Sequence, residues 1–321
     1  MIDTFFSFIK ALATTTYAHV GYVVGENEFA QNLGHDTNYF LSPLTESRNL
    51  LLIFSTLAVV FVLYFLAWKI PAIKNRIIAL RLRLDTYREY VPWILRLSLG
   101  IAFIGASVAQ VLISPTLPHP GFVGMQLVIG FALLGGVAVV PAVILASILF
   151  IVAIAEKAYI IGNAELFAAL LSLLILGGGR PGMDDLFGIP EWKVPHLKKY
   201  VPVLLRIGIG GALVFLSLYE KVLNPHVSDL VVAKYHLTTI IPVGAAMWVF
   251  AVGMIELAVG VLLFIGFQTR LVSAIAFLVL IVTFFFFKEE VYSHVTLFGV
   301  LSVLFITGAG PLSIDAVLRK R

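Results

Sequence analysis

The chain has 321 residues, of which 60% are hydrophobic and 12% are charged, with a mean hydropathy of +1.02 and a formal net charge of +4. This composition excludes an ordinary soluble globular domain and indicates a polytopic membrane protein. Cysteine is absent, which excludes disulfides, thiolate metal sites, iron–sulfur clusters and cysteine nucleophiles within the chain.

The N-terminal segment, residues 1–48, is predicted to lie outside the membrane. It lacks the basic stretch and the small-residue cleavage site of a secretory signal, so we expect it to stay attached. Within it, residues 4–23 either lie in the membrane interface, pack on a partner subunit or form a tenth span. Lys10, His19 and a run of threonines argue against the span.

Nine apolar segments follow that can serve as membrane-spanning helices, each of which needs roughly 20 residues to cross a hydrocarbon core of about 30 Å. They are residues 49–69, 93–113, 122–139, 142–160, 164–178, 201–220, 244–266, 271–287 and 295–309. The sequence therefore predicts an all-α fold, a polytopic transmembrane helix bundle of about nine spans.

The distribution of basic residues predicts the orientation of this bundle. With the N-terminus outside, most of the 22 lysines and arginines fall on the opposite side, many of them between Lys69 and Arg88. Cytoplasmic loops carry such an excess, so we expect a multi-pass protein of the cell (inner, cytoplasmic) membrane with a cytoplasmic C-terminus and no nucleic-acid partner. The basic loop either only sets this orientation or forms an interfacial helix attracted to anionic lipid.

An internal repeat divides the chain. Residues 90–96, Tyr-Val-Pro-Trp-Ile-Leu-Arg, return as Tyr-Val-Pro-Val-Leu-Leu-Arg at residues 200–206, and a long apolar helix follows each copy. Such a match indicates duplication, and the even number of spans in each copy makes the repeats parallel. We predict an outer segment (1–48), an extra transmembrane helix with the basic loop (49–89), a first four-helix repeat (90–190) and a second one (200–321).

The second repeat carries a set of short motifs. They are Leu-Arg-Ile-Gly-Ile-Gly at 205–210, Glu-Lys at 220–221, Ile-Glu-Leu-Ala-Val-Gly at 255–260, Gly-Phe-Gln-Thr-Arg-Leu at 266–271 and Gly-Ala-Gly-Pro-Leu-Ser-Ile-Asp at 308–315. In these motifs the chain resembles the DoxX/DoxD family of small four-helix membrane proteins, here in tandem over about 230 residues. The resemblance implies a membrane component of a quinone-linked redox system, such as thiosulfate:quinone oxidoreductase or a sulfur-oxidising assembly.

The first repeat departs from this pattern where chemistry would be expected. Gln110 replaces the acid at Glu220, Phe131 is predicted to stand opposite Glu256, and no residue corresponds to Arg270. We therefore interpret the first repeat as a degenerate scaffold.

Glu256 is the strongest candidate for a site residue, because an acid at the middle of a membrane helix costs about 2.5–3.5 kcal/mol and is expected to face the bundle interior. Gly253 and Gly260 on the same face would admit a neighbouring helix or a flat ligand. A polar stripe on the preceding helix is predicted to face Glu256; its members are Arg206, Gly210, Ser217 and Glu220. Arg206 and Glu256 then line a quinone or lipid site or form an ion pair that sets helix register, unless Arg206 extends to the interface.

A second group of polar residues is predicted at the outer ends of the helices. Its members are Glu220, Lys221, Lys288, Glu289, Glu290, Tyr292 and His294. His294 with nearby carboxylates could bind the carbonyls of a quinone and conduct protons, although helix ends collect such residues for ordinary reasons. The histidines lie in loops and at helix ends, which argues against transmembrane haem, and we predict no metal site.

Three functions remain open from the sequence. The first is a subunit without a covalent cofactor that anchors or completes a larger respiratory or redox membrane complex, with other membrane or extracytoplasmic subunits and lipids as partners. The second is a quinone-reactive subunit of a thiosulfate or sulfur:quinone oxidoreductase. The third is a proton- or ion-coupled small-solute transporter. We favour the first, a non-catalytic role; an enzymatic role would be that of a quinone-linked oxidoreductase.

Overall fold

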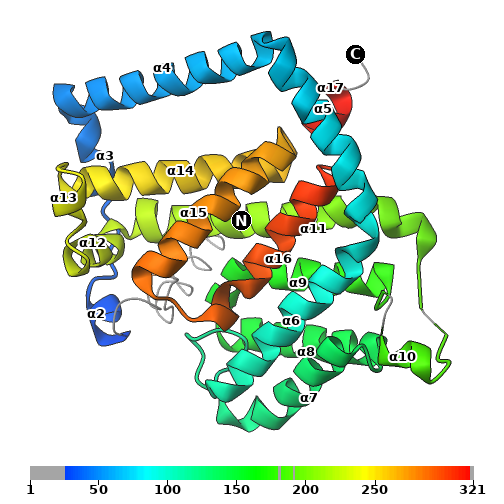
Figure 1. The fold of residues 1–321 in the computed structure, drawn as a ribbon. Coiled ribbons are helices and arrows are strands. Elements are labelled where there is room, and N and C mark those ends of the chain that lie inside the picture. The colour runs from blue at the N-terminus through cyan, green and yellow to red at the C-terminus, as the bar shows by residue number, and fades with distance from the viewer. Residues whose placement is uncertain (1–25, 180–181, 191, 319–321) are drawn as a thin grey trace, which may run out of the picture.

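The computed structural model describes residues 26–179, 182–190 and 192–318. In this part of the chain the regular elements are helices, which confirms the predicted all-α fold (Figure 1). Seven described helical segments are long and apolar enough to cross a membrane, and two shorter apolar helices, Pro120–Gly135 and Val291–Thr307, match the remaining predicted spans. The total of nine spans stays a prediction, and the prediction for residues 4–23 lies outside the described residues.

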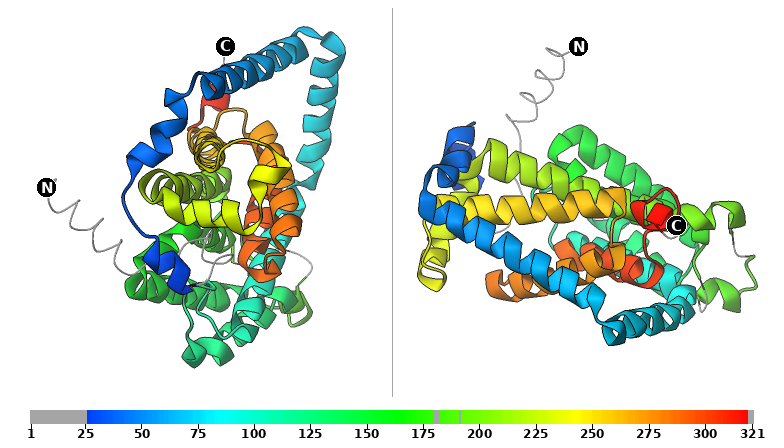
Figure 2. Two further views of the ribbon diagram at one scale, coloured as in Figure 1. Left: turned by 90° about the vertical axis from the view of Figure 1, so that its left-hand side faces the viewer. Right: turned by 90° about the horizontal axis from the view of Figure 1, so that it is seen from above.

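The described chain begins with an N-terminal arm, residues 26–90, that lies around the bundle. Its elements are α2 (Glu26–Gln31), α3 (Thr37–Leu41), η2 (Ser42–Thr45), α4 (Ser47–Lys69), α5 (Pro71–Asp85) and η3 (Thr86–Tyr90). Pro71 begins α5, where its missing N–H is tolerated, and the chain turns sharply between α4 and α5 (Figure 1). Only 6% of the most apolar part of α4 is buried, so α4 lies beside the bundle and not within it (Figure 2).

Two four-helix units form the bundle. The first contains α6 (Val91–Val108), η4 (Pro120–Phe122), α7 (Val123–Gly135), α8 (Val139–Glu156), η5 (Ala158–Asn163) and α9 (Ala164–Leu176). The linker between the units holds α10 (Met183–Leu186) and η6 (Pro195–Tyr200). The second unit contains α11 (Val201–Leu216), η7 (Ser217–Leu223), α12 (Pro225–Lys234), α13 (Leu237–Ile240), α14 (Ala245–Ile265), α15 (Thr269–Phe287), α16 (Val291–Thr307) and α17 (Ile314–Leu318).

The two units share the geometry of the turn after their second long helix. Gly136 and Gly266 end α7 and α14 in the left-handed conformation, with φ of +67° and +70°. Asp184 and Asp315 each accept a hydrogen bond from the backbone N–H two residues beyond that glycine, at 2.9 and 2.7 Å. These matching contacts support the predicted repeat.

The two units pack together through two pairs of helices. Helix α6 of the first unit lies against α16 of the second, and α11 of the second lies against α9 of the first. Close approach at both contacts depends on glycine. A Cβ added to Gly208 would lie 2.4 Å from the Ala168 side chain, and one added to Gly299 would lie 2.4 Å from the Ser98 hydroxyl. One continuous hydrophobic core therefore contains residues of both units.

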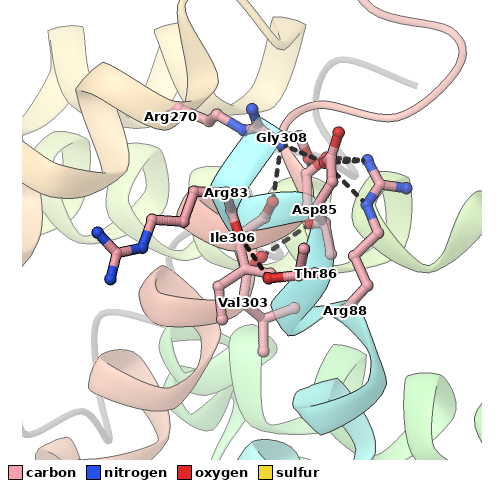
Figure 3. A network of polar contacts seen from close by, with 9 residues as sticks. Arg83, Asp85, Thr86, Arg88, Arg270, Val303, Ile306 and Gly308 are labelled. Carbon is pink, nitrogen blue, oxygen red and sulfur yellow. Dashed lines mark hydrogen bonds and ion pairs between the residues drawn. The ribbon is translucent and has the colours of Figure 1, made fainter. Parts of the chain in front are cut away.

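A polar cluster joins the N-terminal arm to the second unit (Figure 3). Arg270 donates to the Asp85 carboxylate at 2.9 Å and to the Ile306 carbonyl at 2.8 Å. Arg88 donates to the same carboxylate at 3.1 Å and to the Thr307 carbonyl at 3.2 Å. The arginine that distinguishes the second repeat thus holds the end of α5 against α16.

Candidate functional site

A π-helical turn, η7, continues α11 and carries two polar residues of the site, Glu220 and Lys221. Such turns admit one more residue than an α-helical turn and are frequent at functional sites. Here Glu220 and Lys221, which are adjacent in sequence, are both buried. Because a buried charge is costly unless it is paired, their partners determine what the site can do.

Four ionisable side chains form a continuous network around this turn. The Tyr159 hydroxyl donates to Glu220 Oε1 at 2.6 Å. The Lys221 ammonium donates to the other oxygen of Glu220 and lies 2.9 Å from a carboxylate oxygen of Glu256. Side-chain exposure is 0% for Glu220, 10% for Lys221 and 19% for Glu256, so the network runs from the protein interior to a partly exposed carboxylate midway along α14.

Small residues bring α11 and α14 close enough for this network to form. The Ser217 hydroxyl donates to the Gly253 carbonyl at 2.8 Å. About two turns away along each helix, a Cβ added to Gly210 would lie 2.7 Å from the Gly260 carbonyl, so the two backbones nearly touch. A helix therefore occupies the space that these glycines leave. Of the predicted stripe, Gly210 and Ser217 do face α14, whereas the Glu220 carboxylate bonds Tyr159 of η5 and Lys221.

Part of the second unit matches a known protein family. A family model described as DoxX matches residues 201–289. The match supports membership of the DoxX family for this part of the chain, which is called the DoxX segment below. No curated protein and no solved structure matches the chain. The DoxX segment contains Glu220, Lys221 and Glu256, whereas Tyr159 reaches the network from the first unit.

The predicted pairing of Arg206 with Glu256 is wrong. In the DoxX segment the Arg206 guanidinium donates to backbone carbonyls, to that of Ala309 at 3.2 Å and to those of Phe264 and Leu312. The reason is local, because the helix end and the turn beside Arg206 expose carbonyls that lack helical partners. Glu256 pairs with Lys221 instead.

The network of Tyr159, Glu220, Lys221 and Glu256 is called the DoxX network below. His294 lies in a different cluster. Its Nε2 is 2.6 Å from a carboxylate oxygen of Glu289, its Nδ1 is 2.8 Å from the Ser293 hydroxyl, and the ring is buried. Among the described residues no three His, Asp or Glu side chains are placed to hold a metal ion together. The proposed participation of His294 in quinone binding stays a prediction.

The residue opposite Glu256 in the first unit is Gln126, and the prediction of Phe131 is wrong. The left-handed turns at Gly136 and Gly266 align the two helices, and each of these polar residues lies ten positions before its glycine. Gln126 is buried and bonds the Val111 carbonyl at 2.7 Å and the Ile113 N–H at 3.0 Å. A neutral amide with backbone partners thus takes the place of the charged network.

Two buried residues were missed by the sequence reasoning. The sequence did not indicate Tyr159 as a site residue, because its partner Glu220 is 61 residues away and belongs to the other unit. Glu165 is an acid in the apolar helix α9 and is 1% exposed, with Asn163 and Thr296 as the polar side chains beside it. Its place in the first helical turn is common for acids, which concealed it as a candidate.

The N-terminal arm packs against the DoxX network and the residues beside it. Phe29 packs against Tyr159, and Phe40 lies against Gly253. Asp36 accepts a hydrogen bond from the Tyr39 backbone N–H at 2.9 Å and pairs with His226 at 3.0 Å, and both contacts hold the pKa of Asp36 below its ordinary value. The described part of the predicted outer segment therefore packs on its own bundle.

Proposed function

We propose that this DoxX protein is a membrane subunit that anchors or completes a larger respiratory or redox complex. The observation that carries the proposal is that α4 is hardly buried against the bundle. This helix contacts the rest of the chain mainly through η2 and α5 at its two ends, and large apolar side chains such as Leu51, Phe54 and Phe61 are exposed along it. A membrane helix that buries no stripe against its own bundle leaves its apolar sides to lipid or to another membrane subunit, and we take α4 as the surface for such a subunit.

The redox part of the proposal comes from the family resemblance. DoxX-like proteins resemble components of quinone-linked systems, and a partner subunit would carry the electrons to or from the quinone. The DoxX segment would then supply a scaffold and a buried acid–base network beside the partner.

Purification from native membranes in mild detergent tests the proposal. We expect the tagged protein to co-purify with redox subunits, and Phe61→Ala to reduce their recovery several-fold. Phe285→Ala is the matched control, because Phe285 on α15 is as exposed as Phe61, at 73% against 69%, and should leave recovery unchanged. A stable protein that is purified alone from native membranes would count against a subunit role.

A second candidate function is favoured by the network itself, namely direct reaction with a quinone. A quinone head group needs hydrogen-bond donors for its carbonyls and a group that exchanges protons, and Lys221 and Glu256 offer these at membrane depth. Glu256→Gln should then impair quinone reduction by the complex while the protein stays folded. Unchanged turnover would remove Glu256 from the reaction.

A further inference from the structure

A buried acid, Glu165, lies where the two units meet and does not belong to the DoxX network. It is the second residue of α9, and helices α11 and α16 of the second unit pack against α9. A Cβ added to Gly208 of α11 would lie 3.3 Å from the Glu165 Cα. Gly208 is seven residues from the start of α11, about 10 Å along the helix, so Glu165 lies at the depth of the hydrocarbon core.

Within the described residues, Glu165 has polar neighbours but no positive charge beside it. The side chains of Asn163 and Thr296 lie next to its carboxyl group. All three residues are buried, with exposures of 1% for Glu165, 6% for Asn163 and 2% for Thr296. Neither carboxyl oxygen meets a donor with hydrogen-bond geometry, and the amide oxygen of Asn163 has no partner either.

The ionisable groups of the elements around α9 do not compensate this acid. Those on α6, α8, α11, α16 and η5, none of which contacts the carboxyl group of Glu165, are Arg96, Glu156, Tyr159, Arg206, Tyr292 and His294. Those on η6 lie toward the other end of α9, where the Val194 N–H bonds the Ile175 carbonyl at 3.0 Å.

A proton accounts for these unpaired atoms better than a metal ion does. A buried carboxylate without a cation costs several kcal/mol, and protonation removes its charge. The protonated carboxyl group is a donor, and the amide oxygen of Asn163 beside it is an acceptor without a donor, so one proton pairs both groups. A metal ion such as calcium would need more oxygen ligands than these three side chains supply.

We propose that Glu165 binds a proton at neutral pH and shares it with Asn163, which makes the contact between the two units a proton-binding site. The proposal is independent of the redox role, since it involves no residue of the DoxX network. It identifies a second place at membrane depth where the chain can take up or release a proton.

Infrared spectroscopy of the detergent-solubilised full chain at neutral pH tests the proposal, because a protonated carboxyl group and a carboxylate absorb at different frequencies. We expect a protonated-carboxyl band that is lost in Glu165→Gln. The band should persist in Glu256→Gln, the matched control, since Glu256 is also an acid within an apolar helix but is paired with Lys221. Asn163→Leu should shift the band to higher frequency, because the carboxyl group loses its acceptor.

The spectrum of the parent protein is decisive even if Glu165→Gln does not fold. A parent protein without a protonated-carboxyl band would overturn the proposal, as would a band that is lost in Glu256→Gln and kept in Glu165→Gln. Spectra in sodium chloride and in choline chloride distinguish a proton from a metal ion, and we expect the same band in both salts. Loss of the band in sodium chloride alone would assign the site to sodium instead.

Discussion

The guanidinium of Arg206 is surrounded by backbone carbonyls, those of Phe264, Ala309 and Leu312. It therefore joins the end of α14 to the turn after α16. Arg96 binds carbonyls at the equivalent place in the first unit. The motif that repeats in the sequence thus places an arginine bound to backbone carbonyls in each unit, and neither arginine belongs to the network of Tyr159, Glu220, Lys221 and Glu256.

Replacing Arg206 by methionine should destabilise the protein by roughly 2–4 kcal/mol, because three backbone carbonyls, of which that of Ala309 is buried, lose a charged donor. Lysine should restore little of this loss, since an ammonium cannot reproduce the planar arrangement of donors. Unfolding in mixed micelles by titration with a denaturing detergent measures both effects. Stability equal to that of the parent protein would show that the carbonyls find other partners.

At the scale of elements, the crossing of α11 and α14 determines where the network lies. The hydropathy pattern predicts both helices, and the glycines predict a close contact. Neither signal by itself shows which helix fills the space, because a ligand or another helix fits the same pattern; only the polar stripe on the preceding helix predicted that α11 faces Glu256. The structure places α11 there, and the π-helical turn that follows directs Glu220 and Lys221 inward.

The adjacent glycines Gly210 and Gly211 test this crossing. A Cβ at Gly210 would lie 2.6 Å from the Phe264 backbone nitrogen, whereas a Cβ at Gly211 meets no atom within 4 Å. Gly210→Ala should therefore cost about 1–3 kcal/mol through overpacking against backbone, which cannot yield easily. Gly211→Ala should leave stability unchanged or raise it slightly. Equal effects in the same unfolding assay would contradict the close crossing.

For the whole molecule, two helix contacts join the halves of the chain: α6 lies against α16, and α11 lies against α9. The sequence predicts two repeats of four helices in the same orientation, a duplication that stays a prediction. It does not predict that α6 packs on α16 and α11 on α9, because apolar faces of similar helices are interchangeable in a hydropathy pattern. This pairing also brings Tyr159 of one unit to Glu220 of the other.

A chain divided after Ile189 should therefore still assemble. We expect residues 1–189 and 190–321, expressed together, to co-purify through the two contacts between units. Gly299→Val should greatly reduce recovery of the complex, because its side chain would enter the space of Ser98. Gly211→Val, at an open position, is the control and should not. Independent purification of two folded halves would contradict the packing.

The sequence by itself determined the all-α membrane fold, most of the helical segments and the family, because long apolar runs and short motifs are local properties of the chain. It also identified Glu220 and Glu256 as unusual acids, since a charge in an apolar helix is visible without a structure. Only the tertiary structure decided their partners. Arg206 binds nearby free carbonyls and Lys221 bridges the two acids, because the partner of a buried charge depends on which backbones approach it, and that distance is set by helix packing.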